Sequence, residues 1–534
     1  MRHHPSSYQL FSIGDLSATF ALIFDILSVM VFNSTILIFG FGFPKEIITN
    51  HIIPATGLGL IVGGILFMLL NYRLYKKTGI NSTAIPFGVD APSAIATAVC
   101  VVGPLYKLLL EQNDPNAAIN AWYGGVCCLF LIAVIKLFGA FFANFIHKHL
   151  PRGALLGAIS GVAIAFIGFV PLVAIFGNPI IGFVSMGIIF MAMFGKIKMP
   201  FKIPGILLAI IIALILYYGF TEISDPQQIH TMFSNITFNL YLPHFNPQIV
   251  FTHPTMIFQF ISVAIPFAIL TMVGSLTIAE SAKAEKAPYN ARDLILIDGI
   301  ATLVAALFGG VMQTTPYAGY PAYVKMNARS GFLAINSILV AICATFGLIS
   351  IFIQVIPQAI IAPVLLFVAF EIMSQAFTFC DKNHYPVVLF ALLPALAKLI
   401  VIKITDPQII AGNAFEKLAF TEHSVISEKL AMIMIGNGFI ISGLLWGTVL
   451  YLIIEHRWLK ATLFSMILAI LSYFGIIHSI FMSGIAYLPW NLAPQLTHYP
   501  TLISEGYLVL GGLMFLTYLI EHARMLPSKG IKPL

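Results

Sequence analysis

The sequence is poor in charged residues. Asp, Glu, Lys and Arg together make up 9% of its 534 residues, and apolar residues make up 59%. Soluble domains contain about 25% charged residues, so this composition excludes an ordinary soluble protein. Apolar runs of about 20 residues, the length needed to cross a hydrocarbon layer of about 30 Å, recur along the whole chain. The sequence therefore predicts an all-α polytopic membrane protein embedded in a lipid bilayer.

Cysteines and catalytic motifs are equally scarce. The 5 cysteines are odd in number and lack the spacing of a metal site, so we interpret them as small core residues. The sequence contains no Walker-type phosphate loop, no His/Cys metal-binding set and no nucleophile motif. We therefore expect no enzyme activity, no catalytic residue, no metal and no cofactor. The polar amino terminus, which carries Arg2, is not typical of a cleaved signal sequence.

The apolar runs predict sixteen membrane spans, as two sets of seven followed by two additional spans. The first set lies near 14–41, 53–72, 83–108, 122–146, 153–176, 178–195 and 203–221, the second near 256–281, 293–310, 314–329, 331–354, 357–378, 385–402 and 430–454, and the last two near 460–482 and 505–522. Because seven is odd, the second set enters the membrane from the opposite side and forms an inverted repeat.

This pattern divides the chain into four parts. Residues 14–221 form the first repeat, 222–255 an extracytoplasmic linker, 256–454 the second repeat, and 455–534 two additional spans with a cytoplasmic tail. With the amino terminus in the cytoplasm, most of the 27 lysines and arginines fall in cytoplasmic loops. Both termini are therefore expected in the cytoplasm. The net charge of +6 reflects this orientation and indicates no nucleic-acid partner.

Two spans are interrupted in the same way. The segments 82–92 and 313–321 each begin with hydroxyl side chains and continue with a proline, an aromatic residue, a glycine and a second proline. Two prolines so close together break an α-helix, and a membrane tolerates the freed backbone only where protein or a polar cavity covers it. Prolines also accumulate in membrane helices generally, but here residue type, order and repeat position agree. Matching breaks in the third member of each set predict the substrate site of a transporter.

Several motifs resemble the nucleobase–cation symporter-2 family, also called the nucleobase–ascorbate or xanthine/uracil permease family. They are the run from Asp298 to Gly310 followed by Gln313-Thr-Thr-Pro-Tyr, together with Val273-Gly-Ser-Leu, Glu280-Ser-Ala-Lys-Ala-Glu and the run from Thr83 to Ser93. The last three resemble a bacterial subgroup, and the resemblance covers about residues 14–454.

The resemblance implies a 7+7 inverted repeat with core and gate domains, in which spans 3 and 10 carry short strands at the bilayer midplane. It also implies a bacterial inner membrane protein that tends to form a homodimer. We accordingly expect a secondary active transporter, a proton-coupled symporter for a nucleobase-like small molecule such as xanthine or uracil. Sodium is the alternative coupling ion.

Two acidic residues with which the family binds its substrate are missing here. An ungapped alignment places Thr271 at the first acidic position and Ala318 or Gly319 at the second. The hydroxyls of Thr271 and Ser275 and the backbone of the second break replace only part of the hydrogen bonding of a carboxylate. The missing acids favour an alternative, an anion transporter of the sulfate or bicarbonate type on the same architecture. We predict four further binding residues within the breaks: Phe87, Gly88, Tyr317 and Tyr320, three of which offer rings for stacking.

Buried carboxylates in a membrane are costly and therefore candidates for function. We predict Asp25, Asp90, Glu280 and Glu371 for proton coupling, with Asp25 in the middle of the first span as the leading candidate. The alternatives are a structural role for Asp25, a helix cap for Asp90, a gating role for Glu280 and core packing for Glu371. Two further charged residues lie within the predicted spans. Lys136 either snorkels along its helix or pairs with a carboxylate, and Asp298 has an architectural role.

Overall fold

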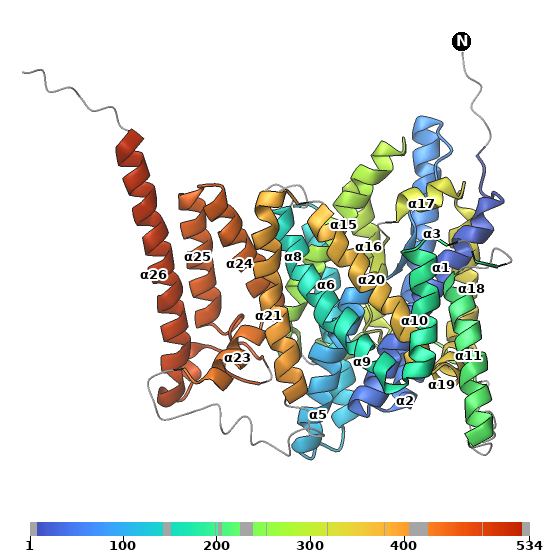
Figure 1. Ribbon diagram of the computed structural model, residues 1–534, viewed down its shortest axis with the longest axis horizontal. Helices are drawn as coiled ribbons and strands as arrows, with labels where there is room; N and C mark the ends of the chain where they lie inside the picture. The colour runs from blue at the N-terminus through green and yellow to red at the C-terminus, as the bar shows by residue number, and fades with distance from the viewer. Residues whose placement is uncertain are drawn as a thin grey trace, which may run out of the picture. The chain divides into compact units, whose positions relative to one another are not determined.

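The computed structural model describes residues 8–142, 151–197, 199–200, 205–224, 239–252, 254–317, 319–378, 380–404, 426–482 and 484–525. The chain forms two compact units. Unit 1 consists of Met1–His149 and Phe166–Glu371, and unit 2 of Leu150–Ala165 and Ile372–Leu534. Both units are almost entirely helical (Figure 1).

The first half of unit 1 contains long apolar helices with short π-helical stretches. They are α1 (Gly14–Thr35), η1 (Ile36–Gly40), α2 (Lys45–Ile47), η2 (Ile48–Ile52), α3 (Ile53–Thr78), α4 (Ala91–Thr97), η3 (Ala98–Val102), α5 (Gly103–Glu111), α6 (Ala117–Gly139), α9 (Val170–Gly177), α10 (Pro179–Met193) and α11 (Gly205–Ser224). Helix α3 ends where Gly79 adopts the left-handed conformation, with a φ of 71°, and its amide donates to the carbonyl of Tyr75.

The second half of unit 1 repeats this helical character and adds shorter pieces. They are α13 (Gln248–Thr252), α14 (Pro254–Gln259), α15 (Ile261–Ala284), α16 (Ala291–Leu307), α17 (Tyr320–Lys325), α18 (Gly331–Thr345), α19 (Leu348–Val355) and α20 (Gln358–Thr378), the last of which continues into unit 2. Helix α16 packs against both α3 and α6, and α18 packs against α3 and α1. The core of unit 1 is therefore built by helices from both halves of the sequence.

Two short strands lie within this helical core. Strand β1 (Phe87–Val89) pairs antiparallel with β2 (Thr314–Pro316), so that Gly88 lies opposite Thr315. Both strands are buried, and they lie where the two proline-containing breaks predict that helix is interrupted. Residues beside them tie the breaks together, because the amide of Ala84 donates to the carbonyl of Arg329 at 2.8 Å.

Unit 2 contains the remaining helices. They are α8 (Arg152–Val162), η4 (Ala163–Phe169, which continues into unit 1), η6 (Lys382–His384), α21 (Tyr385–Ile404), α23 (Glu428–Gly436), α24 (Phe439–Ile454), α25 (Trp458–Tyr473), η7 (Pro489–Asn491) and α26 (Pro494–Met525). Helix α21 packs against α8 and α24, and α25 lies beside α26 (Figure 1). Gly438, in the left-handed conformation with a φ of 67°, lies at the bend between α23 and α24.

The chain is a multi-pass membrane protein with fewer clear spans than the sequence predicts. Among the described residues, 9 helices are long and apolar enough to cross a membrane, or up to 10 if α23 and α24, bent by 88°, form one broken span. The predicted span 314–329 consists of a strand and a helix of 6 residues, in agreement with the break expected there, whereas the predicted span 331–354 divides into α18 and α19. Sixteen crossings are therefore not confirmed, because hydropathy alone does not detect breaks inside apolar sequence.

Candidate functional site

Each strand leads directly into a helix at the centre of unit 1. After β1, Asp90 caps the next helix, because its Oδ2 accepts a hydrogen bond of 2.9 Å from the amide of Ser93. This helix runs without interruption from Ala91 to Glu111 through a π-helical stretch. After β2, Gly319 precedes α17. Pro92 and Pro321 occupy the first turns of the two helices, where a missing amide hydrogen costs nothing.

A half-buried carboxyl group lies beside the strand pair. Asp25 projects from α1, and its carboxyl group lies next to the hydroxyl of Tyr317. That hydroxyl also donates to the carbonyl of Val89 at 3.3 Å. Gly88 leaves the room for this arrangement, because a Cβ atom there would lie 2.3 Å from the Tyr317 hydroxyl. Asp25, Gly88 and Tyr317, all predicted from the sequence, are thus brought together.

Two of the predicted aromatic residues are instead engaged in packing. The ring of Phe87 lies 5.1 Å from that of Phe67 on α3, and it fills the space beside Gly63. Tyr320 is 1% exposed, and its hydroxyl donates to the carbonyl of Thr83 at 3.1 Å. Neither ring therefore offers a free face for stacking in this conformation, whereas Tyr317 is half-buried.

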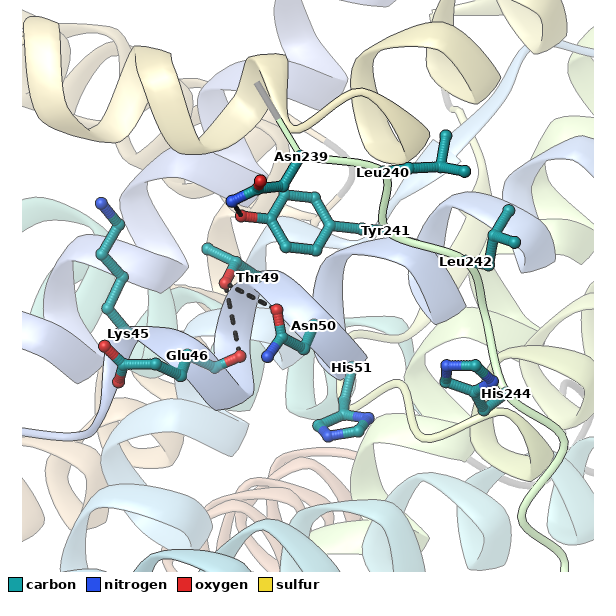
Figure 2. Close-up of a pocket in the computed structure, with 10 residues that line it drawn as sticks. All are labelled: Lys45, Glu46, Thr49, Asn50, His51, Asn239, Leu240, Tyr241, Leu242 and His244. Atoms are coloured by element: carbon teal, nitrogen blue, oxygen red, sulfur yellow. Dashed lines mark hydrogen bonds between the residues drawn. The ribbon is translucent and has the colours of Figure 1, made fainter. Parts of the chain in front are cut away.

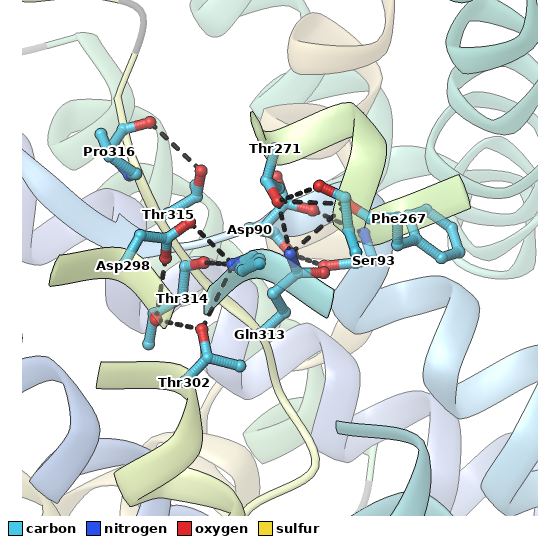
Figure 3. A network of polar contacts seen from close by, with 12 residues as sticks. Asp90, Ser93, Phe267, Thr271, Asp298, Thr302, Gln313, Thr314, Thr315 and Pro316 are labelled. Carbon is cyan, nitrogen blue, oxygen red and sulfur yellow. Dashed lines mark hydrogen bonds and ion pairs between the residues drawn. The ribbon is translucent and has the colours of Figure 1, made fainter. Parts of the chain in front are cut away.

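Gln313, directly before β2, connects this strand to a hydroxyl group on α15. The side-chain amide of Gln313 donates to the hydroxyl of Thr271 at 2.8 Å, and its main-chain carbonyl accepts from the amide of Asp90 at 2.8 Å (Figure 3). One turn further along α15, Ser275 is fully buried, and its hydroxyl has no hydrogen-bond partner among the described residues. Thr271 and Ser275, both predicted to bind substrate, thus lie one turn apart on α15, and Thr271 contacts the residue that precedes β2.

A buried ion pair holds the other side of β2. The ammonium group of Lys136 on α6 lies 2.7 Å from Oδ2 of Asp298 on α16, and the two side chains are 0% and 1% exposed. The ammonium also donates to the main-chain carbonyl of Thr314 at 2.9 Å and to the hydroxyl of Thr302 at 3.2 Å. The hydroxyl of Thr314 donates to Oδ1 of Asp298 at 3.2 Å (Figure 3). Lys136 is therefore paired and does not snorkel, and it lies within electrostatic reach of Asp90.

The remaining predicted residues lie apart from this arrangement or outside the described part of the chain. Glu280 is exposed on the last part of α15. Ala318 and the side chain of Glu371 lie outside the described residues. Gly319 is exposed, directly before α17. Among the described residues, no group of three or more His, Cys, Asp or Glu side chains is arranged to hold a metal ion.

Sequence reasoning did not identify Gln313 and Thr302 as parts of the site. A signal was present, because Asp298 and Thr302 are four residues apart and therefore share a face of α16. The partner of that face is Lys136, a lone cation in an apolar span, and a lone buried cation requires a carboxylate. No sequence spacing, however, links α6 to α16.

Substituting Gly88 with Ala is expected to reduce transport at least tenfold. The new Cβ would lie 2.3 Å from the Tyr317 hydroxyl and 3.0 Å from Cγ1 of Ile26, so it would push β1 away from α1 or rotate the tyrosine. Uptake into proteoliposomes, normalised to the amount of folded protein, measures the effect. Gly274→Ala on α15 is the matched control, because nothing lies within 4 Å of its added Cβ. Equal uptake by both variants would show that close packing at Gly88 is not needed.

Comparison with known proteins finds a match to a different family from the one that the motifs resemble. Residues 172–391, less than half of the chain, match the sulfate permease family. No curated protein matches the sequence. Members of the matching family are transporters and not enzymes, so the prediction that this chain is no enzyme is confirmed.

Three solved structures resemble the chain at low sequence identity. The transmembrane domain of a cyanobacterium bicarbonate transporter, BicA, is 15% identical over 75% of this chain and 97% of its own, with a TM-score of 0.46. SLC26A9 is 12% identical over 84% of this chain and 66% of its own, with a TM-score of 0.51. Murine Slc26a9, an anion transporter in the inward-facing state, is 14% identical over 75% and 69%, with a TM-score of 0.50. At these identities, the likeness to the two SLC26A9 structures shows the fold alone.

The resemblance to the nucleobase–cation symporter-2 family is therefore wrong as an identification. The sulfate permease match over 172–391 includes Thr271 and the whole second break, where most of the motifs behind the resemblance lie. A nucleobase-like substrate and the description as a xanthine/uracil permease are wrong for the same reason. The motifs around the break specify a strand followed by a short helix, and such local backbone does not by itself identify a family. The missing acidic residues at Thr271 and at Ala318 or Gly319 are the positions where the sequence departs from the pattern of the nucleobase–cation symporter-2 family.

Proposed function

We propose that the protein is a secondary active transporter for a small anion of the sulfate or bicarbonate type. The observation that carries this proposal is the match of residues 172–391 to the sulfate permease family. The absence of carboxylates at Thr271 and Gly319 supports it, because fixed negative charge at these positions would repel an anion. We propose that the anion binds near Gly319 and Tyr317, between the ends of the two strands.

The charges around the strand pair support coupling to protons. Three carboxyl groups, those of Asp25, Asp90 and Asp298, surround the two strands, and one buried cation, Lys136, lies among them. Asp298 is held by Lys136, and Asp90 lies within reach of the same ammonium group. The carboxyl group of Asp25 instead lies beside the hydroxyl of Tyr317, so an incoming anion would meet its negative charge unless the carboxyl group took up a proton. We therefore propose proton–anion symport with Asp25 as the proton carrier, and sodium coupling as the alternative.

We further propose the inverted-repeat organisation predicted from the sequence. Residues 14–221 and 256–454 would be the two repeats, 222–255 the linker, and 455–534 an addition. The antiparallel pairing of β1 with β2 supports this, because a two-fold axis that relates two repeats makes equivalent strands antiparallel. Cytoplasmic termini and a bacterial inner membrane complete the proposal.

Uptake into proteoliposomes tests the substrate class. Radiolabelled sulfate, bicarbonate, uracil and xanthine are each offered with and without an inward proton gradient, with protein-free liposomes as the control. We expect one of the two anions to accumulate, more strongly with the gradient, and to be insensitive to competition by either base. Accumulation of a base without any transport of sulfate or bicarbonate would overturn the anion assignment.

A further inference from the structure

A polar pocket of about 720 Å³ lies in unit 1, lined by residues that take no part in the strand pair. One wall is formed by α2 and η2, and the opposite wall by the extended segment before α13 (Figure 2). The lining residues are Lys45, Glu46, Thr49, Asn50, His51, Asn239, Leu240, Tyr241, Leu242 and His244. Seven of these ten residues fall outside the apolar class that makes up 59% of the chain, and Tyr241 adds a phenol hydroxyl, which is an unusually polar lining for so apolar a sequence.

The charge of this pocket depends on its two histidines. Lys45 and the neighbouring Glu46 interact and cancel one another. His51 on η2 and His244 on the opposite wall are close enough to interact electrostatically. The lining residues therefore carry no net charge when both imidazoles are neutral and two positive charges when both are protonated. The protonation of the two imidazoles therefore sets the charge of the pocket.

Neutral hydrogen-bonding groups complete the lining. The hydroxyl of Thr49 donates to Oδ1 of Asn50 at 3.4 Å, which directs the amide N–H groups of Asn50 elsewhere (Figure 2). The amide of Asn239 donates to the hydroxyl of Tyr241 at 3.4 Å. Amides, a phenol and cationic side chains around an open space are suited to an oxyanion, because such a ligand accepts hydrogen bonds on every side.

Both walls of the pocket contact elements that lie close to the β1–β2 strand pair. The ring of His51 stacks on Trp122 of α6 at 4.4 Å, and the indole N–H of Trp122 donates to the carbonyl of Gly309 at 2.7 Å. Gly309 lies two residues after the end of α16 and five residues before β2. On the opposite wall, the amide of Tyr241 donates to the carbonyl of Thr345 at 2.7 Å. Trp122 is thus a built-in reporter of the ionisation of His51.

We propose that this pocket is a second anion site, which binds a doubly charged oxyanion when His51 and His244 are protonated. Besides each other, the two imidazoles face three ionisable groups of the lining, Lys45 and Glu46 from α2 and Tyr241 from the opposite wall. The charges of Lys45 and Glu46 offset each other, so the protonation of the two imidazoles determines the net charge of the pocket. The site is distinct from the proposed transport site, and it does not depend on which anion is carried.

Fluorescence of Trp122 tests the proposal in detergent-solubilised full-length protein. Protonated imidazole quenches a stacked indole, so emission should fall on acidification. Trp122 is isolated by replacing Trp446, Trp458 and Trp490 with Phe. If that variant does not fold, the pH-dependent emission of Trp122→Phe is subtracted from that of the unmodified protein. We expect the midpoint of quenching to be about one pH unit higher in sodium sulfate than in sodium gluconate of equal ionic strength, because binding that favours the protonated form tenfold raises the midpoint by that amount.

Two variants separate this pocket from the transport site. Lys45→Gln and His244→Gln should each lose most of the sulfate-dependent shift, and Lys107→Gln, a change on α5 outside the pocket, should retain it. Equal midpoints in sulfate and gluconate, emission that does not respond to pH, or a shift that persists in both pocket variants would overturn the proposal. Sulfate uptake is measured in parallel. In the unmodified protein, equal midpoints with normal sulfate uptake reject the pocket alone, and a normal shift without uptake of any anion rejects the transport proposal alone.

Discussion

Replacing Asp298 with Asn is expected to destabilise the protein more than any other change proposed for the site. The substitution leaves the ammonium group of Lys136 buried, 0% exposed, without its carboxylate partner. Breaking a buried ion pair on one side costs about 3–5 kcal/mol, because an uncompensated charge remains in a medium of low polarity. The carbonyl of Thr314 and the hydroxyl of Thr302 still contact the ammonium, but neither carries a charge. Thermal unfolding in detergent, followed by the fluorescence of a thiol-reactive dye, measures the loss.

A second substitution should recover most of this stability. In Lys136→Met combined with Asp298→Leu, both charges are replaced by apolar side chains of similar size, and such replacements of buried pairs are often neutral. Asp293→Asn is the matched control, because Asp293 lies half-buried on the first turn of the same helix, and we expect it to change stability by less than about 0.5 kcal/mol. If Asp298→Asn unfolds no earlier than Asp293→Asn, the pair does not stabilise the fold. Transport by the stable double variant then shows whether the charges serve function as well.

The local backbone of the site is well predicted by the sequence. Two prolines within seven residues exclude a continuous helix, and this rule places both breaks at the observed strands, Phe87–Val89 and Thr314–Pro316. Asp90 at the start of a helix that contains Pro92 is recognised as a cap for similar reasons. These inferences succeed because they depend on neighbours in the chain. The same rules do not say how many helices cross the membrane completely, since α18 and α19 read as one apolar run.

The chemistry of the site is less predictable because it depends on residues far apart in the sequence. Phe87 was predicted to face a substrate, yet its ring packs on Phe67, and no periodicity indicates which face of a three-residue strand is covered. Lys136 and Asp298 are separated by more than 160 residues and meet only because α6 packs on α16. The mistaken resemblance to the nucleobase–cation symporter-2 family has a related cause. A proline-containing break specifies a strand and a short helix, and this local backbone does not by itself identify the family or the substrate.

Replacing Asp25 with Asn is expected to abolish proton-driven accumulation of the anion while anion exchange continues. Asn is close to Asp in shape and still offers a hydrogen bond to the Tyr317 hydroxyl, so the site should stay intact. It cannot take up or release a proton, however, and the neutral amide mimics the protonated carboxyl group. In proteoliposomes, the unmodified protein should concentrate the anion when the outside is made acidic. The variant should only equilibrate it, at a rate that does not change with the imposed gradient.

Two further variants show whether the effect belongs to the carboxyl group of Asp25. Asp25→Glu retains a titratable group and should restore part of the accumulation, although the longer side chain disturbs the contact with Tyr317. Glu280→Gln removes a carboxylate that lies exposed on the last part of α15, away from the strand pair, and should leave accumulation unchanged. If Asp25→Asn accumulates the anion normally and Glu280→Gln does not, the proton passes along α15, and the charge of Asp25 has a structural role. Loss in both variants would mean that the proton uses the two carboxylates in turn, one beside the strands and one at the exposed end of α15.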